Sequence, residues 1–253
     1  MARSTAQATS EVDESLTALA QDLLVACKRG ESTDRYRAAL AGATDDDLRR
    51  VREDREAGLA FWINCYNAGT QLLLEERPGL YESPLRFVRF FHAPAVTVAG
   101  VDLPLDRIEN GLLRGGRSKY GLGYLPKVYV TGFERRYRLS DCDPRIHFAL
   151  NCGAESCPAI RAYDPDQIDE QLDLATRAYL DSTVTYDPDS GVARVPRVCL
   201  WFRGDFGGGA GIRDLLRTYD AIPEDATPKI RYRSWDWSKA PDKFAEQIGG
   251  QKP

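Results

Sequence analysis

Histidine is scarce in this sequence, and this scarcity limits the chemistry available to the chain. His92 and His147 are the only two among 253 residues. A general base is most often a histidine, so only two positions can supply an imidazole for that role. The Phe-Phe-His-Ala-Pro context of His92 is typical of a loop or surface histidine. His147 is therefore the histidine to consider for catalysis.

Long apolar runs and a surplus of positive charge are also missing. No segment approaches the roughly 18 apolar residues of a membrane-spanning helix, and residues 1–11 lack the apolar centre of a secretory signal. The net charge is −4, whereas nucleic-acid binding uses an excess of Lys and Arg. We therefore expect a cytoplasmic protein with neither a membrane nor a nucleic-acid partner.

A second pair of closely spaced cysteines, as zinc ribbons require, is absent. The six cysteines are expected to stay reduced rather than to form a disulfide framework. Cys152 and Cys157 could supply metal ligands together with His147, but their spacing is wider than the usual two-residue gap. We therefore assign no metal and expect no cofactor. The other four are expected in the core: Cys27, Cys65, Cys142 and Cys199.

Helical periodicity dominates the first third of the chain. Apolar residues from Val12 to Cys27 recur at helical spacing, and Gly30 follows as a stop signal. Further helices are expected over 33–41 and from about residue 45, where Thr44 is a usable N-cap.

The segment 59–77 predicts a buried helix. It is apolar on all sides until Glu75, the pattern of a helix at the centre of a domain. Asn64 and Asn67 lie inside it, and buried amides must be hydrogen-bonded. We expect these two side chains to hold neighbouring loops.

The later part of the chain mixes strands with short helices. The glycine cluster 207–211 lacks the Lys-Ser/Thr of a P-loop and predicts a flexible turn. Helices come first and strands mainly later, which indicates a single α+β domain with a mainly antiparallel sheet over residues 35–245. Residues 1–34 are expected to form an N-terminal extension and residues 246–253 a tail. The predicted elements are a hairpin over 96–103, a short helix over 105–114, a long functional loop or insertion over 115–142, a strand over 145–151, a helix over 164–180, a hairpin over 184–195, a helix over 212–219 and a strand over 229–237.

The stretch 143–158 brings two cysteines close to His147. Period-two alternation over 145–151 predicts a strand, in which Cys152 would point away from His147. A helix beginning at Cys157-Pro158 would place that thiol at a helix N-terminus and favour its thiolate. This reasoning favours Cys157 over Cys152 as a nucleophile.

Several roles remain open around this stretch. Glu109, Asn64 or Asn67 could orient the His147 imidazole, as the third member of a triad does. The chemistry would be acyl transfer or amide hydrolysis of a papain-like or transglutaminase-like kind, although histidine precedes cysteine here, the reverse of those classes. In the alternative interpretation His147 is a core histidine, the two thiols pack or pair, and Arg145, Asp143 and Glu109 form a buried ionic network.

Five blocks of the sequence follow one another in the order and spacing of a known family: Phe61 to Ala68, Leu105 to Arg114, Asp143 to Cys152 with Ser156 to Pro158, Trp201 to Phe206, and Tyr232 to Ser238. They resemble the blocks of the domain-of-unknown-function family 547 (DUF547). This resemblance implies a fold rather than an activity. Many members carry histidine where Asn110 stands here, so the chain departs from that pattern. The family also occurs in plant proteins beside coiled-coil segments, which implies a possible interaction role.

We therefore expect a cysteine-dependent hydrolase or acyltransferase that acts on an amide or ester of a small molecule or peptide. Cys157 would be the nucleophile, His147 the base, and Glu109 or Asn64 the orienting group. The competing hypothesis is a non-catalytic scaffold that binds a protein partner.

Overall fold

The fold is built around one long buried helix, α4 (Arg55–Glu76). The computed structural model describes residues 15–82 and 84–245. The Asp54 side chain accepts from Ala57 N and caps the helix, and every residue from Gly58 to Thr70 is buried. The all-round apolar sequence therefore gives the central helix that the pattern predicted.

Three helices precede α4: α1 (Leu16–Arg29), α2 (Asp34–Ala41) and α3 (Asp45–Glu53). α1 and α3 pack against α4, whereas α2 packs against α1 and the strand at residues 94–98. Gly30 ends α1 in the left-handed conformation, and Thr44 begins α3 with a capping box. The start expected at Val12 lies outside the described residues. The apolar residues of α1 belong to the same core as α4, so this part of the N-terminal extension is integrated into the domain.

The middle of the chain covers the other side of α4. The predicted hairpin is present as β1 (Pro94–Val98) paired antiparallel with β2 (Val101–Pro104). The predicted short helix is a π-helix, η2 (Arg107–Leu113), and the long connection contains α6 (Gly132–Tyr137). The remaining elements here are η1 (Pro78–Tyr81) and α5 (Pro84–His92).

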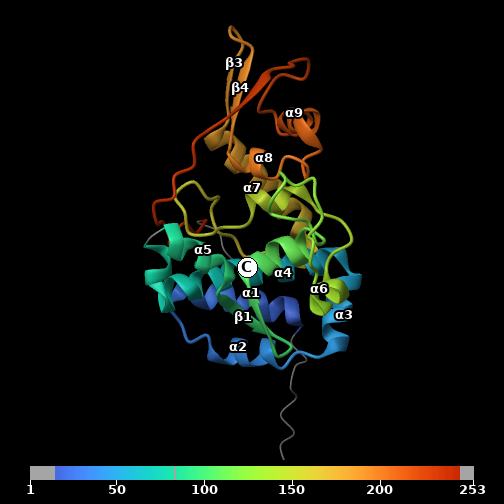
Figure 1. Ribbon diagram of the computed structural model, residues 1–253, viewed down its shortest axis with the longest axis vertical. Coiled ribbons are helices and arrows are strands. Elements are labelled where there is room, and N and C mark those ends of the chain that lie inside the picture. The colour runs from blue at the N-terminus through green and yellow to red at the C-terminus, as the bar shows by residue number, and fades with distance from the viewer. Residues whose placement is uncertain (1–14, 83, 246–253) are drawn as a thin grey trace, which may run out of the picture.

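A second apolar cluster lies at the opposite end of the molecule, where Figure 1 shows β3, β4 and α9. β4 pairs antiparallel with β3 and parallel with β5. The last helix starts inside the glycine cluster, which forms its first turn. The elements are η3 (Pro144–Phe148), η4 (Pro165–Gln167), α7 (Ile168–Thr183), β3 (Thr185–Asp187), β4 (Val192–Val195), α8 (Val198–Trp201), α9 (Gly208–Thr218) and β5 (Lys229–Tyr232).

The α+β class is confirmed: helices dominate, and the sheets among the described residues are small. Within residues 15–82 and 84–245, no helix is long and apolar enough to cross a bilayer. Two predictions of local structure were wrong. Residues 144–148 form a 3-10 helix rather than a strand. The glycine cluster is not a flexible turn, because Gly208–Gly211 belong to the first turn of α9.

Candidate functional site

The 3-10 helix η3 changes where His147 points. The Asp143 side chain accepts from Arg145 N, and Pro144 occupies the first helical position. This local cap outweighs the period-two alternation, because proline fixes a helical φ and the capping carboxylate satisfies a free N–H. The expectation that Cys152 faces away from His147 was wrong, since both residues line one pocket.

The two thiols of the following loop lie in contact. Gly153 turns the chain at φ 85°, a conformation that favours glycine. The Sγ atoms of Cys152 and Cys157 are then 3.3 Å apart, and Cys152 N–H donates to Cys157 Sγ over 3.3 Å. The predicted helix at Cys157-Pro158 is absent: among the described residues, helical structure resumes only at Pro165. Hydrogen bonds rather than a helix dipole therefore act on the Cys157 thiol.

These hydrogen bonds give the two thiols different acidities. Burial opposes ionisation of Cys157, but the donors from the Cys152 thiol and from backbone N–H groups outweigh it and lower its pKa. The same contact, together with burial, raises the pKa of Cys152 well above its ordinary value. A thiolate is the reactive form of cysteine, so the pair favours Cys157 as the nucleophile and Cys152 as its proton-bearing neighbour.

A buried asparagine of α4, Asn67, holds this loop, as expected. Asn67 Nδ2 donates to Ala149 O over 3.1 Å, and its Oδ1 accepts from Asn151 N over 2.9 Å. Asn151 in turn donates to Pro158 O over 2.7 Å and accepts from Gly153 N over 2.7 Å. The two ends of the thiol loop are thus tied to each other and to the central helix.

Asn64 does not orient His147. Its Nδ2 donates to Tyr163 O over 2.7 Å, and its Oδ1 accepts from Tyr163 N over 2.9 Å. Both polar atoms of the amide are used by one backbone segment. Asn64 is therefore a second loop anchor, and its candidacy as the orienting residue is corrected.

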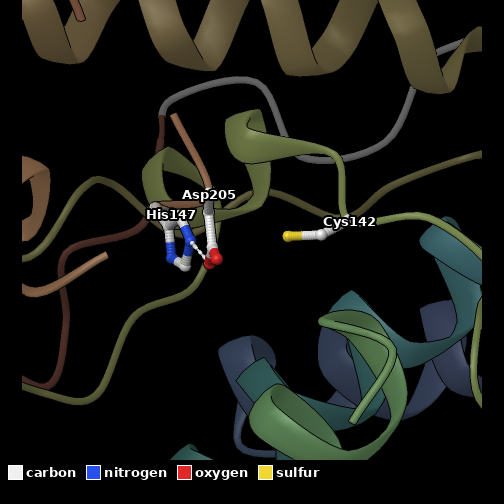
Figure 2. Close-up of side chains that lie close together, drawn as sticks. All are labelled: Cys142, His147 and Asp205. Carbon is white, nitrogen blue, oxygen red and sulfur yellow. Dashed lines mark hydrogen bonds and ion pairs between the residues drawn. The ribbon is translucent and has the colours of Figure 1, made fainter. Parts of the chain in front are cut away.

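The imidazole is oriented by Asp205, which sequence reasoning did not select. His147 Nε2 lies 2.9 Å from Asp205 Oδ2, and both side chains are buried (Figure 2). Phe202 stacks on the imidazole with ring centroids 3.9 Å apart. A carboxylate acceptor at Nε2 assigns the Nε2–H tautomer and leaves Nδ1 as the proton acceptor. Asp205 lies in the block Trp201 to Phe206, but nothing in the sequence pairs that block with His147.

The Asp205 carboxylate is kept ionised by its neighbours. Burial would raise its pKa, but hydrogen bonds from His147 and Arg114 hold the pKa far below its usual range. Arg114 Nε lies 2.6 Å from Oδ2, and Arg117 Nη1 lies 2.8 Å from Oδ1. Burial lowers the pKa of His147, which favours the neutral imidazole.

Cys142 approaches the same pair, so that one donor atom each from Cys142, His147 and Asp205 lie within 4.8 Å of one another (Figure 2). This donor set does not suit a cation. Two guanidinium groups already neutralise Asp205, and burial raises the pKa of Cys142 to about 12, which keeps its thiol protonated. The geometry instead fits a histidine–carboxylate pair packed beside a core cysteine.

A pocket of about 350 Å³ connects the thiol pair with His147. Cys152, Cys157, His147 and Glu109 all line it, and its walls are largely aromatic: Tyr66, Phe91, Phe202, Trp201, Trp235 and Trp237. His147 and the two thiols face each other across this pocket. Within residues 15–82 and 84–245, no hydrogen bond joins the imidazole to either thiol.

Glu109 does not orient the imidazole either. Asp205 holds Nε2 of His147, and within residues 15–82 and 84–245 no hydrogen bond joins Glu109 to His147. Burial, only partly offset by the attraction of Arg114, raises the pKa of Glu109 to about 7. A carboxyl group with this pKa exchanges protons near neutral pH. The pocket therefore contains a thiol of lowered pKa, a neutral imidazole and a carboxyl group able to carry a proton.

Comparison with known proteins identifies one similarity. The model of the family described as "Protein of unknown function, DUF547" matches residues 51–180. No curated protein and no solved structure matches the chain. The matched region contains both thiols, His147 and Glu109, whereas Asp205 lies beyond it.

Proposed function

The chain belongs to the DUF547 family, whose function is unknown, and from its own pocket we propose that it is a cysteine-dependent hydrolase or acyltransferase acting on an amide or ester. The observation that carries the proposal is the 3.3 Å contact between the Cys152 and Cys157 thiols inside a pocket that His147 and Glu109 also line. A thiol of lowered pKa that faces the same pocket as an imidazole held by a carboxylate provides the groups that papain-like and transglutaminase-like chemistry uses.

In the first step the Cys157 thiolate attacks the carbonyl carbon and forms a tetrahedral intermediate. The bond from carbon to the leaving nitrogen or oxygen then breaks, and the protonated form of Glu109 supplies the proton to that atom. This assignment follows from the pKa of about 7 of Glu109, which leaves part of the population protonated at neutral pH. The product of this step is a thioester on Cys157.

In the second step water, or another acyl acceptor, attacks the thioester. The unprotonated Nδ1 of His147 accepts the proton, since Asp205 holds the other nitrogen. The carbon–sulfur bond breaks and releases the Cys157 thiolate, and the proton returns to Glu109 through solvent. His147 is thus the base and Glu109 the acid, a change from the orienting role first assigned to Glu109.

Thiol labelling with iodoacetamide and acyl-enzyme trapping from p-nitrophenyl esters test this proposal. We expect stoichiometric labelling near pH 7, an acyl adduct on Cys157, and loss of both in Cys157→Ala. Cys27→Ala is the control, because burial raises the pKa of Cys27 to about 12. Cys152→Ala should slow labelling, since the donor that stabilises the thiolate is removed. No labelling of the native protein at neutral pH would refute the proposal.

A specific surface feature favours the alternative, a scaffold for a protein partner. The irregular segment 120–129 exposes large apolar side chains that are 42% to 106% accessible: Tyr120, Leu122, Tyr124, Leu125, Val128 and Tyr129. Exposed apolar groups gathered in one segment are typical of interaction surfaces. If this is the function, Tyr129→Ser should abolish binding of an isolated partner while Cys157→Ala leaves that binding intact.

A further inference from the structure

A second cavity lies directly beside the thiol pocket. Its volume is about 620 Å³, and α7, the segment 155–161 and the segment 233–236 line it. Cys157 and Trp235 line both this cavity and the thiol pocket. A molecule held in the second cavity would therefore lie next to the proposed nucleophile.

This cavity is basic although the chain as a whole is acidic. Four cationic and two anionic side chains line it, an excess of two positive charges, whereas the whole chain has a net charge of −4. The cations are Arg161, Arg197, Arg233 and Lys243, and the anions are Glu155 and Asp236. The cavity thus concentrates positive charge beside the Cys157 site.

The partners of these cations show which of them are available to a ligand. Lys243 Nζ lies 3.7 Å from the Glu155 carboxylate and donates to Cys157 O over 3.0 Å. Arg233 Nη1 donates to Thr183 O. The side chains of Arg161 and Arg197, two partly exposed residues, form no hydrogen bond or ion pair with any residue of 15–82 or 84–245.

Two guanidinium groups that line one cavity and have no acid partner suit an oxyanion. Guanidinium binds carboxylate and phosphate through paired N–H donors in a planar fork. Leaving such groups unpaired in one concave site costs free energy, because like charges that line the same cavity repel each other. A bound anion would remove this repulsion and satisfy the donors together.

We propose that this cavity binds an oxyanion group of the substrate, carboxylate or phosphate, through Arg161 and Arg197. This inference rests on the proposed function, since it places the reacting carbonyl of the same molecule at Cys157. The apolar part of the substrate then packs in the neighbouring pocket against Trp201 and Trp235. The substrate class is therefore an anionic ester or amide with an apolar acyl or leaving group.

Calorimetric titration tests the anion site without requiring any catalysis. Inorganic phosphate and succinate are the two probes, and the tighter one indicates which oxyanion the cavity prefers. We expect Arg161→Gln with Arg197→Gln to weaken binding by at least about tenfold, because each charged hydrogen bond contributes about that much. Arg177→Gln is the matched control: it lies on α7 but pairs with Asp220, outside the cavity. Failure of both probes to bind at millimolar concentration, or equal affinity in the double variant, overturns the proposal.

Paired alkylating reagents test whether the site adjoins Cys157. Iodoacetate and iodoacetamide react identically: the thiolate sulfur bonds to the methylene carbon and iodide leaves. They differ in charge, because iodoacetate carries a carboxylate where iodoacetamide carries a neutral amide. We expect the ratio of iodoacetate to iodoacetamide rates at Cys157 to fall several-fold in the double arginine variant and to fall when phosphate is added. A ratio unchanged by both treatments refutes the link to Cys157. No labelling by either reagent refutes the proposed function instead, and the titration still decides the anion site.

Discussion

Replacing Glu109 with glutamine should remove a specific part of the pH dependence of stability. Burial raises the pKa of this carboxyl group from 4.5 to about 7 on folding. Between these values the folded protein keeps a proton that the unfolded chain has released. The contribution of Glu109 to the free energy of unfolding is therefore fully present below pH 4.5 and is lost as the pH rises through 7.

The magnitude follows from the size of the shift. One pKa unit corresponds to about 1.4 kcal/mol, so the wild-type protein should lose about 2–3 kcal/mol from this group between pH 5 and pH 8. The buried His147 acts in the opposite direction, because its lowered pKa makes the folded state less stable as the pH falls below 6.5. Comparing wild type with Glu109→Gln isolates the glutamate, since the His147 contribution is common to both.

Urea unfolding at pH 5 and pH 8 measures the effect. The free energy of unfolding of Glu109→Gln should rise relative to that of wild type by about 2–3 kcal/mol between the two pH values. Glu224→Gln is the control, because Glu224 is exposed and its replacement should leave the wild-type profile unchanged. Parallel profiles for wild type and Glu109→Gln would show that Glu109 is already ionised at pH 5, which removes its role as the acid.

Two further substitutions test the supports of the site. Arg114→Met should destabilise the protein by about 3–5 kcal/mol in urea unfolding, because it removes a buried positive charge that pairs with the Asp205 carboxylate. Adding Asp205→Asn should restore part of this loss. If it restores none, the lost charge pair is not the cause. Asn67→Ala should cost about 2–4 kcal/mol, because Ala149 O and Asn151 N each lose a buried partner. An Asn67→Ala protein as stable as wild type would show that the thiol loop does not depend on α4.

The sequence by itself determined the elements that depend on neighbouring residues. Gly30 ends α1 and Thr44 begins α3, because helix caps act within one turn. The apolar run of α4 predicted burial, since a helix without a polar face is stable only inside a core. At 145–151 the alternating pattern predicts a strand, but the equally local Asp143-Pro144 cap outweighs it and starts η3.

Only the tertiary structure decided how the site is assembled. The thiol contact depends on Asn67, which reaches the loop from α4, and the imidazole depends on Asp205, 58 residues beyond His147. Neither pairing leaves a periodic signal, because contacts between distant segments are set by how the helices pack rather than by local spacing. The sequence therefore supplied Cys157, His147 and Glu109 as candidates. Folding assigned Asp205 as the orienting group, made Asn64 an anchor and gave Glu109 the pKa of a proton carrier.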